Sequence, residues 1–319
     1  MSEVARVRVP ASSSNLGSGF DCVAVAVDRW LTVSAKRENR RTGFTIVRDG
    51  TLRAVKLRPD QDLLSRGFRA AAAVRGSAPL GGVTIAATSD IPVGRGLGSS
   101  AAAIVAGALL ADSALELGLT RAQVLEIGAT IEGHPDNVAA AIYGGAILSV
   151  HTNSGLVTSP LEIAPGIELL IAVPPFSNDT KAARAALPPT LPHAEAVIAA
   201  GRSAALVQGL ARGDGALLGA ALDDLLHVPF RRAHIPGYDA VVQAARAAGA
   251  FGATLSGAGS AILAIAPRER SSAVGAAMIS AWREIGIDAE LIKGSGTVAG
   301  AHSPHLSPSH ALSAVEETV

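Results

Sequence analysis

The stretch Ile91–Ala103, IPVGRGLGSSAAA, places three glycines and two serines between a strand-like run and a long alanine-rich run. Glycine has no Cβ atom, so Gly94, Gly96 and Gly98 let the backbone turn sharply and approach a ligand closely. Because the alanine-rich run is typical of a helix, the N–H groups and the dipole of its first turn would attract an anion. We therefore interpret this stretch as a phosphate-binding loop, with a tight structural turn as the alternative.

Two other phosphate motifs can be compared with the same stretch. A Walker A loop requires a lysine, and this stretch contains none. The string GLGSSA fits the loose dinucleotide pattern G-x-G-x-x-A, but its acidic partner should end the next strand about 20 residues on. Glu116 lies inside a helical stretch instead. The serines Ser99 and Ser100 add hydroxyl groups that could cap the helix, bind phosphate or reach a metal ion.

Further polar residues that could do chemistry lie on both sides of this loop. The N-terminal string VPASSSNLGSGFDCVAVAV carries Asn15 and Asp21, which could also be plain turn residues. In LEIGATIEGHPDNVAAAIYGG, Glu126 could be a solvated helix residue, and Asp136 or Asn137 could be a helix cap. Each of these positions therefore has a structural as well as a chemical interpretation.

The second half contains two arginine-bearing strings, FSNDTKAAR with Arg184 and HVPFRRAHIPGY with Arg231 and Arg232. A guanidinium group presents a fork of N–H donors that matches a carboxylate geometrically. Surface helices also carry arginines routinely, so the strings alone leave both interpretations open.

The elements that must position these residues follow from hydrophobic periodicity. Ser99 to about Leu117 is apolar nearly all round, which indicates a buried helix, and a second helix should begin at a Thr120 cap and end at Gly133. Alternating or continuous apolar runs predict strands. The predicted strands are 5–11, 23–35, 43–48, 81–89, 167–174 and two within 253–267, with a helix at 60–75.

This order is rich in strands and only partly alternates with helices, so it favours an α+β fold of two lobes rather than a doubly wound sheet. We place the N-terminal domain at 1–160 and the C-terminal domain at 161–295. Residues 296–319 have turn residues and little periodicity, and we expect a disordered tail there.

Composition limits the classes of partner. Lysine plus arginine and aspartate plus glutamate both number 27, so no net charge attracts nucleic acid or an anionic membrane. The single cysteine, Cys22, fits a reducing compartment. The first ten residues lack the apolar core of a signal peptide, and the longest apolar runs fall short of the roughly 18 residues of a membrane span. We expect a soluble, cytoplasmic protein.

The string PVGRGLGSSAA resembles the phosphate loop of the GHMP kinases, a superfamily whose loop works without a lysine. Backbone donors, the helix dipole, Mg²⁺ and Arg95 would then replace the Walker lysine. The strings around Asn15, His134, Arg184 and Arg231 resemble those of the homoserine kinases in that superfamily, and LSGAGSAILAI resembles its third glycine motif. The matches run in family order from about Val7 to Ile265, which covers most of the chain.

The resemblance implies an N-terminal lobe like the second domain of ribosomal protein S5, with a left-handed β-α-β crossover, and a C-terminal α/β sandwich. It implies that ATP and Mg²⁺ serve to phosphorylate the side-chain hydroxyl of a small-molecule substrate, L-homoserine, and it leaves a homodimer open. The implied ATP-binding residues are Pro92, Val93, Gly94, Arg95, Gly96, Leu97, Gly98, Ser99, Ser100, Ala101, Ala102, Gly257 and Gly259. The implied metal ligands are Ser100 and Glu126. The implied substrate residues are Asn15, Asp21, His134, Asn137, Thr180, Arg184 and Arg231, of which Asn15, Asn137, Arg184 and Arg231 would be catalytic.

In this interpretation Asp21, with His134, would hold the substrate ammonium, and the two arginines would hold its carboxylate. One departure from the relatives is Asn137, where mevalonate-type kinases carry an aspartate, because an amide cannot accept a proton as a carboxylate would. The alternatives are another kinase of the superfamily, acting on threonine or mevalonate, and a catalytically silent sensor of the same fold.

Overall fold

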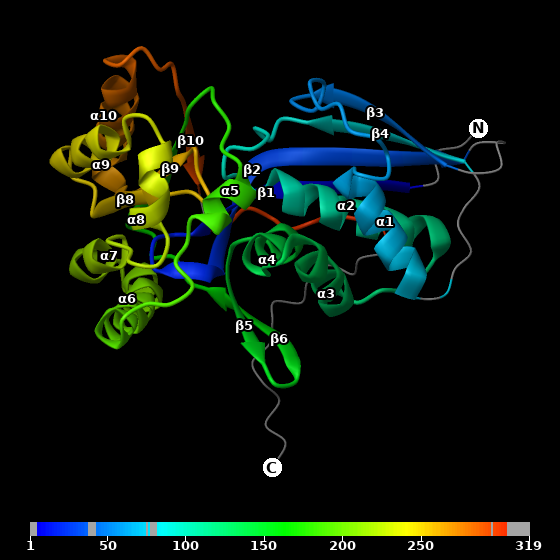
Figure 1. Cartoon of the computed structure of the whole chain (residues 1–319), viewed down its shortest axis with the longest axis horizontal. Helices are drawn as coiled ribbons and strands as arrows, with labels where there is room; N and C mark the ends of the chain where they lie inside the picture. The colour runs from blue at the N-terminus through cyan, green and yellow to red at the C-terminus, as the bar shows by residue number, and fades with distance from the viewer. Residues whose placement is uncertain (1–4, 38–42, 75, 77–81, 295, 305–319) are drawn as a thin grey trace.

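The computed structural model describes residues 5–37, 43–74, 76, 82–294 and 296–304, and its two sheets form two lobes (Figure 1). The first sheet has six strands in the order β3-β4-β2-β5-β6, with β1 paired to β2. Its strands are β1 (Ala5–Asn15), β2 (Gly19–Arg37), β3 (Phe44–Gly50), β4 (Val83–Ser89), β5 (Ala146–Thr152) and β6 (Gly155–Leu161). Its helices are α1 (Leu63–Val74), α2 (Ser99–Leu115), α3 (Arg121–Glu132) and α4 (Asp136–Tyr143).

The second sheet has four antiparallel strands in the order β10-β7-β9-β8. Its strands are β7 (Ile167–Val173), β8 (Gly252–Leu255), β9 (Ile262–Pro267) and β10 (Glu290–Gly294). Its helices are α5 (Thr180–Ala185), α6 (His193–Arg212), α7 (Gly215–Ala221), α8 (Val228–Arg231), α9 (Tyr238–Ala247) and α10 (Ser271–Arg283). The expected α+β architecture is therefore confirmed, and the chain leaves the first sheet after Leu161, where the sequence changes character.

Both lobes are layered. In the first lobe α2 and α4 pack on β1 and β2, and β3 and β4 are parallel neighbours joined through α1. In the second lobe the β7 side chains alternate between two cores: Leu169 and Ile171 face α6 and α7, whereas Leu170 and Ala172 face α9 and α10. Figure 1 shows these two helix pairs on opposite sides of the second sheet. The core on the α6 side is continuous with that of the first lobe, so the lobes share buried apolar side chains.

The helix that follows the glycine loop is buried as expected. Helix α2 has its central residues, among them Ile104, Val105 and Leu109, fully buried. Helix α3 begins at the predicted cap, where Thr120 and Gln123 form a reciprocal capping box, and it ends at Gly133 in a left-handed conformation. These two caps fix where the turn between α3 and α4 starts.

The expected disorder of the tail is wrong for residues 296–304. Ala301 N–H donates to the carbonyl of Ala141 in α4, and His302 pairs with Arg8 of β1 through two backbone hydrogen bonds. Ala301 and Ser303 are buried. This segment returns from the second lobe to the first and holds the end of α4, while residues 305–319 lie outside the described residues.

No helix among the described residues is both long enough and apolar enough to span a membrane.

Candidate active site

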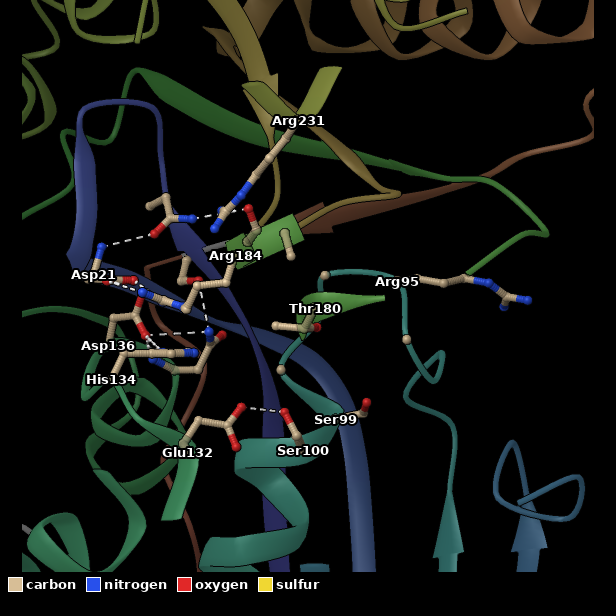
Figure 2. A pocket seen from close by; sticks show the side chains of 18 residues that line it. Asp21, Arg95, Ser99, Ser100, Glu132, His134, Asp136, Thr180, Arg184 and Arg231 are labelled. Carbon is tan, nitrogen blue, oxygen red and sulfur yellow. Dashed lines mark hydrogen bonds and ion pairs between the residues drawn. The ribbon is translucent and has the colours of Figure 1, made fainter. Parts of the chain in front are cut away.

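A cleft lies between the lobes, and six segments line it: the β1–β2 turn, the glycine loop, the α3–α4 turn, α5, α8 and the β8–β9 loop (Figure 2). These segments are far apart in the sequence and meet only in the fold. The described lining residues are Ser14, Asn15, Asp21, Gly94, Arg95, Gly96, Gly98, Ser99, Ser100, Glu132, His134, Asp136, Asn137, Thr180, Arg184, Arg231, Gly257 and Ala258.

The glycine loop needs glycine for its backbone and for its packing. Gly94, Gly96 and Gly98 have φ values of 70°, 75° and 62°, in the left-handed region that other residues avoid. A Cβ atom on Gly96 would lie 2.0 Å from the carbonyl oxygen of Ser256, and one on Gly98 would lie 2.2 Å from Ser12 Oγ. No side chain caps the first turn of α2 in the described structure, which suits the binding of an anion there.

Not every residue of the predicted loop lies at the cleft. Four of its apolar residues are buried and line neither this cleft nor the apolar cavity beside it; they are Pro92, Leu97, Ala101 and Ala102. Arg95 is directed away from Ser99 and Ser100 (Figure 2), and its guanidinium donates to the carbonyl of Pro175 at 2.6 Å. The expectation that Arg95 takes the place of a Walker lysine has no support in this arrangement. Gly257 lines the cleft, whereas Gly259 is buried behind it.

Ser100 at the start of α2 donates to the carboxylate of Glu132 at 2.5 Å, which joins the glycine loop to the end of α3. Glu132 is mostly buried, and this burial raises the pKa of its carboxyl group, although the bond from Ser100 opposes the shift. A desolvated carboxylate beside a hydroxyl offers two of the oxygen ligands that Mg²⁺ prefers.

Glu126, the metal ligand that the resemblance implied, does not line this cleft, whereas Glu132 does. Glu126 is exposed and lines another hollow with His151 of β5; this hollow shares His134 with the cleft but includes no residue of the glycine loop. Six residues of helix separate Glu126 from Glu132, which corresponds to a rotation of about 240° around the axis, so both cannot face the same cleft. The signal that could have identified Glu132 is its position directly before the turn that carries His134 and Asp136.

Asp21 and Arg184 form a bidentate ion pair, with nitrogen–oxygen distances of 2.7 and 2.9 Å. The sequence-based interpretation assigned these two side chains to opposite ends of a substrate. The ion pair brings them into contact instead, and hydrogen bonding to Asp21 raises the pKa of Arg184. Each side chain remains partly exposed, at 31% for Asp21 and 43% for Arg184, so a ligand can reach the pair.

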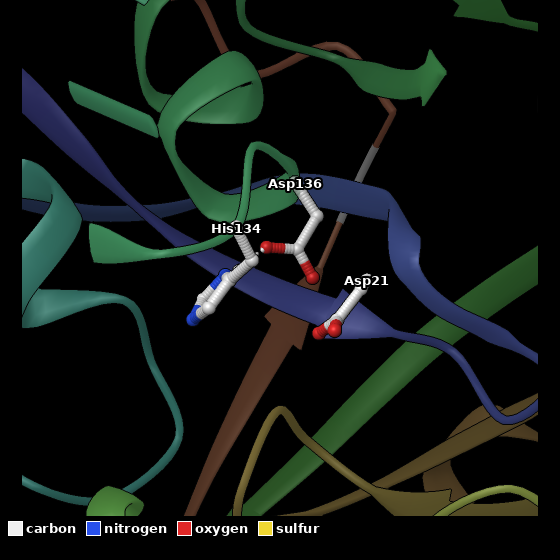
Figure 3. Close-up of side chains that lie close together, drawn as sticks. All are labelled: Asp21, His134 and Asp136. Atoms are coloured by element: carbon white, nitrogen blue, oxygen red, sulfur yellow. Dashed lines mark hydrogen bonds and ion pairs between the residues drawn. The ribbon is translucent and has the colours of Figure 1, made fainter. Parts of the chain in front are cut away.

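His134 and Asp136 lie beside Asp21 (Figure 3), and one nitrogen or oxygen atom of each side chain lies within 4.8 Å of those of the other two. His134 Nδ1 lies 2.6 Å from Asp136 Oδ1. Burial alone would lower the pKa of His134, but the hydrogen bond and charge of Asp136 outweigh it and raise that pKa. Asp136 is 1% exposed, and its Oδ2 atom has no hydrogen-bond partner in the described structure. The sequence indicated Asp136 only as a helix cap.

The two asparagines of the expected site line the cleft, but their amide groups already have partners. Asn137 accepts from Ser12 Oγ and donates to Ser14 Oγ, both at 2.8 Å. Asn15 donates to the carbonyl of Gly257 at 3.0 Å and accepts from a backbone N–H. Both amides therefore hold the cleft wall together, whatever else they do.

The neighbouring arginines Arg231, the last residue of α8, and Arg232, directly after it, lie in different surroundings. Arg231 lines the cleft and is 2% exposed, and burial together with the charge of Arg184 lowers its pKa to about 10. Arg232 is exposed and pairs with Asp239 at 3.1 Å, outside the cleft. Thr180 lies at the first turn of α5 and lines the cleft beside Arg184.

A second cavity of about 260 Å³ adjoins the cleft at the glycine loop. Its wall is mainly apolar, and its charged lining residues among those described are Arg48 and Asp62, which form an ion pair at 2.5 Å. It shares with the cleft the residues Gly94, Ser99, Ser100 and Thr180. An apolar cavity thus lies on one side of the helix N-terminus and a charged cleft on the other.

Comparison with known proteins identifies the family. The models of the GHMP kinase N-terminal and C-terminal domains match residues 63–145 and 206–284. The chain is 42% identical to a homoserine kinase of Gloeobacter violaceus over 86% of this chain and 92% of that protein. It is 40% identical to a homoserine kinase of Trichormus variabilis, over 89% of this chain and 93% of the other.

Solved structures point the same way. A homoserine kinase from Cytophaga hutchinsonii superposes with a TM-score of 0.83 and 29% identity, covering 94% of this chain and 96% of that one. A mevalonate kinase from L. major, at 17% identity and a TM-score of 0.62, shares the fold. The lysine-free loop, the two-lobed architecture and these similarities agree: the chain belongs to the homoserine kinase family of the GHMP kinases.

Proposed function

We propose that the protein transfers the γ-phosphoryl group of ATP to the side-chain hydroxyl of L-homoserine. The observation that carries the proposal is the arrangement around α2: its N-terminus lies between an apolar cavity and a cleft with both acidic and basic side chains. The cavity suits a nucleobase, the helix N-terminus suits phosphate, and the cleft suits a zwitterion. The similarity to homoserine kinases supports this choice of amino acid.

Glu132 and Ser100 are the proposed Mg²⁺ ligands, in place of Ser100 and Glu126. Their oxygen atoms are within hydrogen-bond distance of each other at the start of α2, where the phosphates would lie. When bound, Mg²⁺ supplies positive charge that neutralises the charge developing on the transferred phosphoryl group. The buried Glu132 carboxylate is disfavoured as an isolated charge, so a cation beside it would be stabilising.

Asp136 is the proposed acceptor for the substrate ammonium. Its Oδ2 atom is buried without a hydrogen-bond partner among the described residues, and such an atom gains when a charged donor reaches it. Asp21 is less available for this role, because Arg184 already occupies both of its oxygens.

The Asp21–Arg184 pair suits a zwitterion in a different way. A substrate carboxylate can displace Asp21 from part of the Arg184 fork, while the substrate ammonium restores a positive charge near Asp21. Arg231, whose side chain reaches the same cleft, completes the carboxylate site. This exchange of partners leaves no charge unpaired, which limits the cost of burying the substrate.

We assign no general base. Phosphoryl transfer depends mainly on positioning and charge stabilisation, so a site can work without one. Asn137, whose amide holds Ser12 and Ser14, keeps the cleft wall in place next to the glycine loop.

The direct test is ADP release measured with homoserine, threonine, serine and mevalonate under identical conditions. The proposal predicts the highest kcat/KM for homoserine and little turnover of mevalonate, which has no ammonium for Asp136. Preference for another substrate would assign the protein to a different kinase of the superfamily. Nucleotide binding without turnover of any of the four would indicate a sensor.

A further inference from the structure

Phe20, in the β1–β2 region, lies between a buried histidine and two guanidinium groups. Its ring stacks on the ring of His227, with centroids 5.0 Å apart and an interplanar angle of 20°. The guanidinium carbons of Arg231 and Arg184 lie 5.2 and 5.6 Å from the same ring. The two arginines of the proposed carboxylate site therefore lie near one aromatic ring, on which a histidine also stacks.

His227 is fully buried, and both of its ring nitrogens have partners. Nε2 lies 3.2 Å from the carbonyl oxygen of Gly17, and Nδ1 lies 3.4 Å from Arg231 Nη1. Arginine can only donate, so Nδ1 must be the accepting nitrogen and Nε2 must carry the proton. Burial, helped by the charge of Arg231, lowers the pKa of His227, although Asp224 opposes the shift, and this keeps the ring neutral.

The segment that carries His227 is itself held in place. Asp224 Oδ2 accepts hydrogen bonds from the backbone N–H groups of His227 and Val228, at 2.8 and 2.7 Å, just before α8 begins. At the other side, Arg231 Nε donates to the carbonyl of Ala183 in α5 at 3.1 Å. Two of the five N–H donors of Arg231 are thus used by the protein, in positions that fix the plane of the guanidinium.

We propose that His227 and Phe20 are positioning residues for substrate selection: they orient Arg231, and with it Arg184, so that their free N–H groups meet the substrate carboxylate. This inference rests on the proposed function. Neither residue itself lines the cleft, and His227, the first residue of the string HVPFRRAHIPGY, had no role assigned from the sequence. A histidine that merely filled the core would not need the accepting nitrogen that Arg231 uses, and a phenylalanine would fill the same space.

The test compares two alcohols that differ only in the group recognised. Homoserine carries a carboxylate, and 3-aminopropan-1-ol is the same molecule without it. The variant His227→Phe keeps the stacked ring and the volume but removes both nitrogen contacts. The variant Phe20→Leu removes the aromatic face. His234→Phe, at an exposed histidine three residues beyond Arg231, is the matched control.

We expect His227→Phe to raise the KM for homoserine at least tenfold and Phe20→Leu to raise it about fivefold, because a charged hydrogen bond and cation–π contacts are lost. The kcat/KM for 3-aminopropan-1-ol and the KM for ATP should change less than twofold, and His234→Phe should behave as wild type. His227→Gln, whose amide can both donate to Gly17 and accept from Arg231, should recover most of the affinity. If 3-aminopropan-1-ol reacts too slowly to measure, the inference is tested by the KM for homoserine, the KM for ATP and the recovery of homoserine affinity in His227→Gln.

Three results for His227→Phe would overturn the inference. They are an unchanged KM for homoserine, an equal fall in kcat/KM for homoserine and 3-aminopropan-1-ol, or a rise in the KM for ATP as large as that for homoserine. The last two would assign His227 a purely structural role, which a lowered Tm would accompany. If His227→Phe does not fold, Phe20→Leu provides the same comparison. Absence of homoserine turnover in the wild-type protein would refute the proposed function, and the inference with it. Normal wild-type turnover, with a His227→Phe variant that loses the same activity toward both alcohols, would refute the inference alone.

Discussion

Replacing Glu132 by glutamine should lower kcat by about a hundredfold and leave the protein folded. Glutamine has nearly the same shape, and its amide oxygen can still accept the hydrogen bond from Ser100. The change therefore removes a charge at the proposed metal site and little else.

The size of this effect follows from the role proposed for the metal. Mg²⁺ contributes several kcal/mol of charge stabilisation at the transition state, and loss of its one proposed charged protein ligand should forfeit about 3 kcal/mol of that. Each 1.36 kcal/mol corresponds to a factor of ten in rate, so about 3 kcal/mol is roughly a hundredfold. The KM for homoserine should change much less, because Glu132 is not among the groups proposed to hold the amino acid.

Thermal stability should change in the opposite direction to activity in Glu132→Gln. The pKa of Glu132 is raised on folding, mainly by burial, so its contribution to stability is present at low pH and is lost as pH rises through the folded-state pKa. Without Mg²⁺, Glu132→Gln should therefore be at least as stable as the wild-type protein at neutral pH. The difference in Tm between them should shrink as pH falls and the wild-type carboxyl group becomes protonated.

The assay is steady-state ADP release with a titration of Mg²⁺, and the matched control is Glu126→Gln on the exposed face of the same helix. The control should keep wild-type kcat. Near-normal turnover of Glu132→Gln at ordinary Mg²⁺ concentrations, or a hundredfold loss in Glu126→Gln, would refute the metal assignment.

Asp136→Asn should raise the KM for homoserine at least tenfold with little change in the KM for ATP, because it removes the charge proposed to hold the ammonium; the converse pattern would contradict that role. Arg231→Lys should raise the homoserine KM ten- to a hundredfold, whereas Arg232→Lys should stay within about twofold, and equal effects of the two would refute the carboxylate site. Gly98→Val should abolish ATP binding in calorimetry and lower Tm, because its side chain would collide with Ser12 of β1 and Asn137 of α4. Gly118→Val is the control, because Gly118 has a similar φ of 65° and open space around it. Equal losses of ATP affinity and Tm in the two variants would show that the effect comes from backbone strain rather than from a phosphate site at the loop.

The sequence predicted best the features that depend on neighbouring residues. The glycine loop and the buried helix after it follow from the order of glycine, serine and apolar residues in that stretch. The start of α3 follows from the capping signal at Thr120. Each of these rests on residues within a few positions of one another, where local backbone preferences decide the outcome.

The misplaced features depend on contacts between distant segments. Asp21 and Arg184 are 163 positions apart, and only the packing of the lobes brings them together. The choice between Glu126 and Glu132 depends on which face of α3 turns to the cleft, and the weak amphipathic pattern of that helix does not indicate it. The segment at 296–304 has little periodicity, and it is held to the first lobe by backbone hydrogen bonds with Arg8, Ala141 and Gly145, which a pattern of side chains does not indicate.

The most direct measurement is identification of the product by phosphorus NMR after incubation of the protein with ATP, Mg²⁺ and L-homoserine. Phosphorylation of the hydroxyl predicts a phosphomonoester signal coupled to the terminal CH₂ protons, appearing in equal amounts with ADP. Release of inorganic phosphate alone, or no change in ATP, would contradict the proposed transfer to homoserine.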